Sequence, residues 1–477
     1  MKSSAYLYKL LDNDGVVRRD LPQASPVSSR ATPIDTVETE SLAARLGSSA
    51  RNFSILASLR PPQPQKPKLV SSAEGTIASM LLTIPVGNTS GELAAIYEAL
   101  FKTLPASVKL ICLVNTGSKP IVETWLTKYG RVSSAEVVEA PDHVGFSLWA
   151  QDAYAVSTAS GDETFLVEPL SFLRYADAVI SDYVTTATAL RNFQTPLYFQ
   201  GGNILIGDDF WLIGIDYPTK TLQYVENAIF PNTGETPEQL VRRLFSEYLD
   251  VERTLHYVGS TVPVPSEDIV LAKEGRNYFV DLVYQGNHEG TAQPLFHIDM
   301  FLTLAGRSAS GRYRLLVGDP SLAPAAPSTS APGYSMQNVY DAIAKSLETR
   351  FDVIRNPLPL TFHTQKIAVS ALNQPQDPDL HAIYVELTNA GLAQVDLRSW
   401  YFATANNALV QNDPADRQVW LPTYGHGATY AYLQASDVAN RRLWESFGYT
   451  VTELPSFHRL ARGLGAVHCI QKYLARA

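Results

Sequence analysis

A histidine and an aspartate one residue apart are the first candidates for chemistry. His297 and Asp299 lie in an apolar run from Phe296 to Leu304 in which nothing breaks a strand. Because alternate residues of a strand face the same way, the run predicts a strand with His297 and Asp299 on one face and Ile298 and Met300 on the other. Alone, such a pair is typical of the exposed face of an edge strand. Other stretches of the sequence are needed to decide whether the pair has a chemical role.

A cysteine follows two closely spaced glycines near the C-terminus. Gly463 and Gly465 precede Cys469, and glycines let a backbone turn sharply or approach a ligand before a strand. Free cysteine is among the most buried residue types, so Cys469 by itself is more typical of a core position. Cys112 stands in an apolar run, where a core position is the clear prediction.

A second aspartate, Asp152, ends the stretch Trp149 to Asp152. A cysteine, a histidine and one carboxylate would suit a papain-like protease, in which the carboxylate orients the histidine. Two carboxylates, Asp152 and Asp299, would repel a thiolate at Cys469, which is unfavourable for an acyl substrate. A cationic substrate relieves that repulsion. Guanidinium is the obvious candidate, because it is planar, permanently charged and able to donate bidentately to carboxylates.

Length and composition limit the class of protein. The 477 residues exceed one typical core and indicate about three domains or one large repetitive domain. A net charge of -9 argues against non-specific binding to nucleic acid, which needs a basic face. No run approaches the ~20 apolar residues of a membrane span. The N-terminus lacks the apolar core of a signal peptide, and two cysteines make no disulfide framework or metal-ligand spacing, so we expect a cytoplasmic protein.

Apolar periodicity predicts alternating strands and helices from residue 80 onward. Strands are expected at 80–84, 109–114 and 135–139, and helices at 92–104 and 120–129. This alternation indicates an α/β architecture.

Farther along the chain, pairs of strands alternate with single helices. Strands are expected in hairpins at 204–213 and 297–317, at 383–385, as a pair within 400–411, and at 466–471; helices are expected at 236–248, 337–350 and 437–447. Two strands and a helix thus recur about five times without visible sequence identity. Such units could close on themselves as a repeat, or the chain could hold several unrelated α/β domains in series.

Residues 1–75 differ from the rest of the chain. Tyr6 to Leu11, the turn Asp12 to Gly15 and then Val16 and Val17 predict a small hairpin. The prolines from Pro61 to Pro67 predict a stiff linker. We therefore expect residues 1–75 to form an N-terminal extension and residues 76–477 to form the main domain.

Five stretches together resemble the guanidine-modifying enzymes of the pentein fold, which include arginine deiminases, agmatine deiminases, amidinotransferases and protein-arginine deiminases. They occur in the family's order at 149–152, 199–203, 296–301, 406–410 and 463–469. The likeness is greatest for the catalytic domain of protein-arginine deiminases, because Trp149 to Asp152 has their Trp-x-Gln-Asp form.

The resemblance implies a fold and a role for each matched residue. The fold would be a pentein, a five-bladed α/β propeller of ββαβ units over residues 76–477. Cys469 matches the nucleophile, and His297 matches the general acid/base. Asp152 and Asp299 match the carboxylates that clamp the guanidinium, and Trp149 matches a pocket wall. The other matched residues expected to bind substrate are Gln151, Gln200, Gly202, Asn203 and Asn407.

Two departures from the family narrow the expected activity. Small-molecule deiminases carry Glu-Gly-Gly where this chain has Gln200 to Gly202, which argues against free arginine or agmatine. Calcium-binding relatives carry acidic residues where this chain has Ala153 and Ala155. We therefore expect no calcium at that place, no other metal and no organic cofactor.

The expected activity is hydrolysis of an arginine-type guanidinium, peptidyl or free, to a ureido product (citrulline) and ammonia through a covalent adduct on Cys469. An amidinotransferase or an agmatine-type deiminase is the enzymatic alternative, and a pentein scaffold used for binding is the non-enzymatic one. The presence of Cys469, His297, Asp152 and Asp299 together argues against the scaffold. We expect a monomer or homodimer that binds a guanidino substrate, and neither nucleic acid nor membrane.

Overall fold

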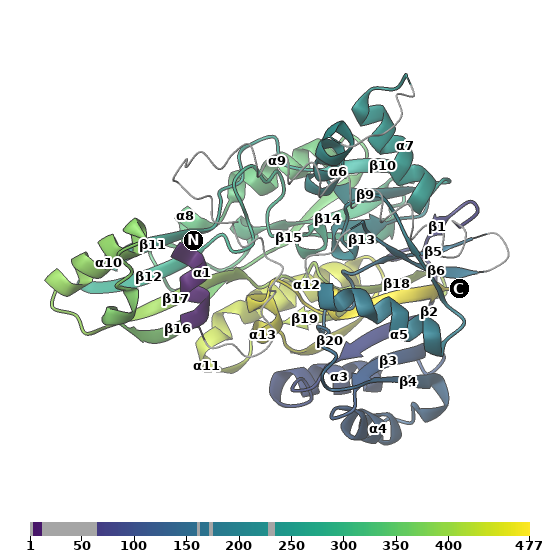
Figure 1. Ribbon diagram of the computed structural model, residues 1–477, viewed down its shortest axis with the longest axis horizontal. Coiled ribbons are helices and arrows are strands. Elements are labelled where there is room, and N and C mark those ends of the chain that lie inside the picture. The colour runs from purple at the N-terminus through teal and green to yellow at the C-terminus, as the bar shows by residue number, and fades with distance from the viewer. Residues whose placement is uncertain (1–2, 12–63, 160–162, 171–174, 228–233) are drawn as a thin grey trace. The chain divides into compact units, whose positions relative to one another are not determined.

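The computed structural model describes residues 3–11, 64–159, 163–170, 175–227 and 234–477 (Figure 1). These residues fold as a mixed α/β protein with several separate sheets. Contacts between Cα atoms divide the chain into two compact units. Of the described residues, unit 1 comprises 3–11, 90–103 and 260–468, and unit 2 comprises 64–89, 469–477 and those between 104 and 259.

The described part of unit 2 is built on three sheets, with strand orders β21-β2-β3-β4, β1-β5-β6-β7 and β10-β9-β8. In the first sheet β2, β3 and β4 are parallel, and the C-terminal strand β21 joins antiparallel to β2. The strands are β1 (Lys68–Leu69), β2 (Ile77–Ile84), β3 (Lys109–Asn115), β4 (Ala135–Ala140), β5 (Ala155–Thr158), β6 (Thr164–Glu168), β7 (Arg191–Gln194), β8 (Ile204–Ile206), β9 (Phe210–Gly214), β10 (Thr254–Val258) and β21 (Gln471–Arg476).

Helices α4 (Lys119–Lys128) and α5 (Val179–Ala187) pack against β3 and β4, as Figure 1 shows. Helices α6 (Asp216–Asn227) and α7 (Pro237–Leu249) pack against each other. The start of α7 is set by its sequence, because Thr236 and Gln239 form a capping box in front of a proline. Apolar side chains of α7 and the strands β5 to β9 form one buried core cluster, which includes Trp211 and Phe245.

Unit 1 is also built on three sheets in its described part, with orders β11-β12-β17-β16, β13-β14-β15 and β18-β19-β20. The strands are β11 (Asp268–Glu274), β12 (Asn277–Val283), β13 (Leu302–Arg307), β14 (Tyr313–Asp319), β15 (Asp352–Pro357), β16 (Leu360–Ala368), β17 (Gln394–Phe402), β18 (Leu409–Asp413), β19 (Asp416–Thr423) and β20 (Thr450–Ser456). The helices are α1 (Ser3–Leu10), α3 (Gly91–Thr103), α8 (Ala331–Tyr334), α9 (Gln337–Leu347), α10 (Pro378–Asn389), α11 (Gly427–Tyr430), α12 (Gln434–Ser446) and α13 (His458–Arg462).

The arrangement of two strands and a helix that the sequence predicts does recur. An antiparallel hairpin is followed by a helix and by a third strand parallel to the second in β5-β6-α5-β7 and in β8-β9-α7-β10. The same order occurs in β13-β14-α9-β15 and in β18-β19-α12-β20. No described helix is long and apolar enough to cross a membrane.

The prediction of a hairpin at the N-terminus is wrong for its first strand. Residues 3–10 form α1, and Leu7 is fully buried among apolar side chains of the β11-β12-β17-β16 sheet and α10. In Figure 1, α1 and α10 both lie beside this sheet. The apolar residues of α1 gain more by packing as a helix on this surface than the weak local preference for a strand could provide. Val16 and Val17 lie outside the described residues.

One other predicted strand and one predicted strand pairing are also wrong. Residues 383–385 belong to α10, which begins after Asp377, whose side chain accepts a hydrogen bond from Leu380 N, and Pro378 occupies the first turn. The buried residues Leu380, Ile383 and Leu387 follow a helical spacing. The apolar run at 383–385 is therefore part of a helix whose buried face includes Ile383. Residues 400–411 are not a strand pair, because β17 pairs with β12 and β16 while β18 pairs with β19.

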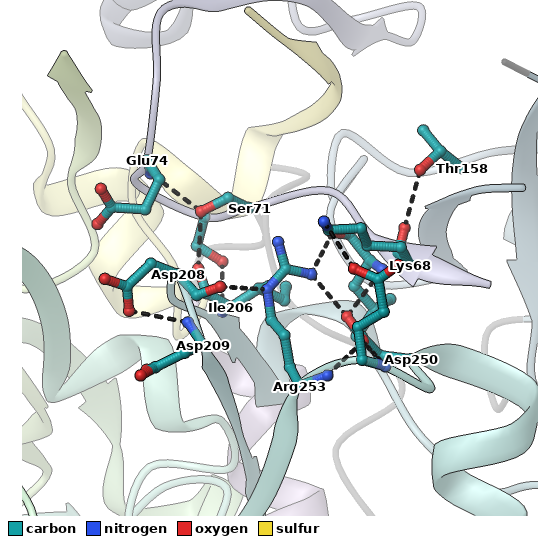
Figure 2. A network of polar contacts seen from close by, with 12 residues as sticks. Lys68, Ser71, Glu74, Thr158, Ile206, Asp208, Asp209, Asp250 and Arg253 are labelled. Carbon is teal, nitrogen blue, oxygen red and sulfur yellow. Dashed lines mark hydrogen bonds and ion pairs between the residues drawn. The ribbon is translucent and has the colours of Figure 1, made fainter. Parts of the chain in front are cut away.

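A polar network fixes the first described segment of unit 2 (Figure 2). The Asp250 carboxylate, which is fully buried, accepts from the Leu69 amide at 3.0 Å and from Arg253 Nη1 at 2.6 Å. The same Arg253 guanidinium donates to the carbonyls of Leu69 at 2.9 Å and Asp208 at 3.1 Å. Nearby, Ser71 Oγ donates to the Ile206 carbonyl at 2.9 Å. The Asp250–Arg253 pair therefore connects β1 to the turns before β9 and β10.

Replacing Asp250 with alanine should lower the free energy of unfolding by about 3 kcal/mol, because Arg253 would keep a buried charge without its carboxylate. Urea unfolding followed by circular dichroism measures this change. The control is Lys68→Ala, which breaks the exposed Lys68–Glu252 ion pair at 2.8 Å and should cost less than about 1 kcal/mol. An equal loss of unfolding free energy in the two variants would show that the buried Asp250–Arg253 network contributes no more stability than the exposed ion pair.

Candidate active site

Cys469 lies in a single 3-10 turn, η8 (His468–Ile470), just before β21. The strand expected at 466–471 is therefore wrong over most of its length, because pairing with β2 begins only at Gln471. The Cys469 residue is fully buried, and its carbonyl accepts a hydrogen bond from Gln151 N at 3.2 Å. This bond joins the candidate nucleophile to the Trp149–Asp152 stretch within unit 2.

Trp149–Asp152 forms a tight turn whose residues are buried. Asp152 N donates to the Trp149 carbonyl at 3.3 Å, and Trp149 N donates to Ser147 Oγ at 3.1 Å. Asp177 accepts hydrogen bonds from both the amide of Ser147 at 2.6 Å and its hydroxyl at 2.7 Å, which anchors the start of the turn. Asp152 itself is 0% exposed. Aspartate is rarely buried so completely, which makes Asp152 a candidate for binding a cation.

Gly201 is the contact point between the Gln200–Asn203 stretch and the turn that holds Asp152. Its N–H donates to the Asp152 carbonyl at 2.9 Å, and its carbonyl accepts from Gln151 Nε2 at 3.1 Å. A Cβ atom at position 201 would lie 1.9 Å from the Gln151 carbonyl oxygen and 2.7 Å from that of Tyr154. Only glycine fits here without moving the backbone beside Asp152.

Gln200, Gly202 and Asn203, which the sequence predicts to bind substrate, are all buried in this part of unit 2. They belong to the turn η3 (Gly201–Asn203) or precede it. Asn203 N donates to the Gln200 carbonyl at 3.0 Å, and Asn203 Nδ2 donates to Gly214 O at 3.3 Å. These bonds hold the turn in place, and contact with substrate stays a prediction for these residues.

Lys472 is a residue near the candidate nucleophile that the sequence analysis did not identify as part of the site. It lies three residues after Cys469 and is only 7% exposed, and its Nζ donates to the Gln151 carbonyl at 3.1 Å. A cavity of about 20 Å³, large enough for one water molecule, is lined by Gln151, Gly201 and Lys472 among others. A lysine inside the otherwise uncharged segment Cys469 to Leu474 was the available signal, because lysine is almost never buried without a partner.

Tyr154, two residues after Asp152, is a buried phenol beside two carboxylates. The pKa of Tyr154, which is fully buried, is raised well above its ordinary value, chiefly by burial and further by the charges of Asp177 and Asp152. Lys472 Nζ lies 5.8 Å from the centre of the Tyr154 ring. We call Cys469, Gln151, Asp152, Gly201 and Lys472 the nucleophile group.

His297 does not lie on a strand. The chain forms a 3-10 turn, η4 (Ile298–Met300), directly after it, and β13 begins only at Leu302. The prediction of a strand with His297 and Asp299 on one polar face is therefore wrong, and both residues are buried. The turn is closed by Met300 N donating to the His297 carbonyl at 3.3 Å.

The two residues before His297 have unusual backbone angles. Leu295 and Phe296 have φ of 60° and 68°, in the left-handed region that bulky side chains rarely adopt. Gln293 Nε2 donates to the Phe296 carbonyl at 2.7 Å, Leu295 N donates to Asn287 Oδ1 at 2.9 Å, and the Phe296 ring stacks on His297 at 4.1 Å between centroids. These contacts stabilise a strained backbone that orients His297.

Asp299 is bonded to a histidine that the sequence did not single out. His468 Nδ1 lies 2.8 Å from Asp299 Oδ2, and both residues are at most 3% exposed. Asn407, a predicted substrate-binding residue, donates from Nδ2 to the Asp299 carbonyl at 3.4 Å and accepts from Ala466 N at 3.0 Å through Oδ1. We call His297, Asp299, Asn407 and His468 the histidine group. All four residues belong to unit 1.

Comparison with solved structures finds similar folds at low sequence identity. An X-ray structure of a protein provisionally named as an agmatine deiminase matches with a TM-score of 0.51 and 13% identity, over 85% of this chain and 95% of that one. C. jejuni agmatine deiminase matches with a TM-score of 0.48 and 9% identity, over the same shares of the two chains. No protein-family model and no curated protein sequence matches significantly. At 13% identity the first likeness is one of fold.

The ten residues expected from the sequence thus fall into two sets. Unit 2 holds Cys469, Asp152, Trp149, Gln151, Gln200, Gly202 and Asn203, and unit 1 holds His297, Asp299 and Asn407. The signal for the missed His468 was its place beside Cys469. Among the residues that the structure describes, no group of three or more His, Cys, Asp or Glu side chains is arranged to hold a metal ion.

Gly201→Ala should destabilise the protein by about 3 kcal/mol, because the new methyl group would overlap the Gln151 carbonyl oxygen. Urea unfolding gives the change in free energy. Gly145→Ala is the matched control, since nothing lies within 4 Å of a Cβ at that position and its backbone is not in the left-handed region. If Gly201→Ala is as stable as Gly145→Ala, the close approach of Gly201 to Gln151 is not present in solution.

Proposed function

We propose that the protein is a hydrolase that cleaves a C–N bond of a guanidine group, a deiminase with a cysteine nucleophile. The observation that carries the proposal is the hydrogen bond that Gln151 N donates to the Cys469 carbonyl, which joins a fully buried cysteine to the residue before a fully buried aspartate. A cysteine and a carboxylate combined in this way suit a cationic electrophile. The fold likeness to a structure provisionally named as an agmatine deiminase supports the same chemistry.

In the proposed mechanism the Cys469 thiolate attacks the guanidinium carbon, and a C–S bond forms. His297 gives a proton to the departing nitrogen, and the C–N bond breaks. Ammonia departs, and a covalent thiouronium remains on Cys469. His297 then takes a proton from water as the water oxygen attacks the same carbon. The C–S bond breaks, the thiolate is restored, and the hydroxyl proton of the adduct passes to solvent as the ureido product is released. Asp152 and Asp299 hold the positive charge and align the carbon for attack.

The substrate that we propose first is a small guanidine of the agmatine type. The activity in the provisional name of the structure that matches with a TM-score of 0.51 supports it ahead of peptidyl arginine. Peptidyl arginine remains the second candidate, because Gln200 stands where small-molecule deiminases carry glutamate. An amidinotransferase would use the same four residues, but the alkyl nitrogen of the substrate would depart in place of ammonia and an amine would attack in place of water. Because protein groups and water supply every proton in the scheme, we propose that the reaction uses no metal or organic cofactor.

Purified protein should release ammonia from at least one of three guanidines: agmatine, free arginine or a blocked arginine peptide. The expected order of rates is agmatine above peptide, and the ureido product should appear in equal amounts with ammonia. Ammonia and ureido product are both quantified, with and without an added amine acceptor. A new guanidine on the added amine together with the substrate's free alkyl amine, and no ammonia, would indicate amidino transfer. No product from any of the three would contradict the deiminase proposal.

Cys469→Ala should abolish turnover and leave the fold intact, because it removes the atom that forms the covalent adduct. Cys112→Ala is the matched control. It sits in β3, where burial raises the pKa of its thiol to about 12, so it is no nucleophile at neutral pH. Its loss should cost on the order of 1 kcal/mol of stability and little activity. Turnover retained by Cys469→Ala and lost by Cys112→Ala would reverse the assignment.

A further inference from the structure

The bond between His468 and Asp299 is a buried contact between residues that are distant in sequence. Their side chains are 4% and 2% exposed, and Nδ1 and Oδ2 lie 2.8 Å apart across a separation of 169 residues. A carboxylate only accepts hydrogen bonds, so His468 Nδ1 carries the proton and donates it. This single buried N–H can therefore hold the Asp299 carboxylate in one orientation.

A second set of bonds joins the same two chain segments. His468 N donates to the Asn407 carbonyl at 3.3 Å, and Ala466 N donates to Asn407 Oδ1 at 3.0 Å. Asn407 Nδ2 in turn donates to the Asp299 carbonyl at 3.4 Å. The main chain at 466–468 and the turn at Asp299 are thus connected through Asn407 as well as through the His468 ring. All of these contacts lie within unit 1.

We propose that His468 is a positioning residue for Asp299. Through Nδ1 it fixes the orientation of the Asp299 carboxylate, so that its negative charge is directed at the guanidinium of the substrate. This inference rests on the proposed function. His468 is also the residue directly before Cys469, so the chain that leads into the nucleophile is anchored by the same contact. The acid–base role stays with His297, and His468 transfers no proton.

Substitution of His468 by asparagine or by glutamine tests which of its two ring nitrogens is needed. The amide nitrogen of asparagine occupies the place of Nδ1, while that of glutamine reaches the place of Nε2. His468→Gln should therefore lower kcat/KM for agmatine by about 10- to 100-fold, the range expected for losing a hydrogen bond to a charged group. His468→Asn should recover most of this loss, and KM should change more than kcat. His288→Gln, at an exposed position in unit 1, is the control and should leave both constants unchanged.

The pH profile separates positioning from proton transfer. His468→Asn has no titratable group at this position, so its kcat/KM profile should keep the same acid and alkaline limbs as the wild type. Loss of one limb in His468→Asn would make His468 an acid–base group and overturn the proposal. Equal activity of His468→Asn and His468→Gln would overturn it as well, because the role of Nδ1 would then be absent.

A double-mutant cycle tests the contact without relying on catalysis. The urea midpoint should fall more in His468→Gln than in His468→Asn, and this difference should shrink when Asp299 is also changed to asparagine. Additive effects would overturn the contact itself. If the wild type turns over none of the three guanidines, the proposed function has failed, while the cycle still decides whether His468 holds Asp299. Should His468→Gln not fold, His468→Ala takes its place in both measurements.

Discussion

Both polar groups of the Gln151 main chain are bonded to the C-terminal segment, and the nucleophile group depends on this. The amide donates to the Cys469 carbonyl, and the carbonyl accepts from Lys472 Nζ across a separation of 321 residues. Because the Gln151 carbonyl belongs to the peptide that precedes Asp152, these two bonds also set the direction of the aspartate. Gly201 must lack a side chain for the same reason, since it approaches this carbonyl more closely than any Cβ allows.

Two buried arginines of the described residues, Arg253 and Arg398, are held by carboxylates, which offset the cost of removing their charges from water. The protein provides its own example of a bound guanidinium at Arg398, which is 1% exposed. Asp281 binds it bidentately at 2.6 and 2.8 Å, Glu274 accepts a further bond at 2.9 Å, and the Phe279 ring lies 4.0 Å from the guanidinium carbon. Two carboxylates and an aromatic face are the same combination that we propose Asp152, Asp299 and Trp149 to offer a substrate.

Backbone strain is concentrated before His297. Two consecutive bulky residues in the left-handed region cost roughly 1–2 kcal/mol each, and the hydrogen bonds from Gln293 and to Asn287 offset part of that cost. Such strain persists where the surroundings determine the conformation strongly, which is common at functional sites. A strand through His297 would have needed no strain, and it would have placed the imidazole on the face of a sheet instead of in a buried turn.

The sequence by itself determined where α7 begins, because its apolar spacing predicts a helix from residue 236, and it determined the types and chain order of the ten expected site residues. It also indicated the recurrence of two strands and a helix. Only the tertiary structure decided that residues 6–10 are helical, that His297 and Cys469 lie in turns, and that Lys472 and His468 contact Gln151 and Asp299. The physical reason is the distance along the chain over which each interaction acts. Caps and periodicity act over three or four residues, whereas these choices depend on burial and hydrogen bonds between segments that are more than a hundred residues apart.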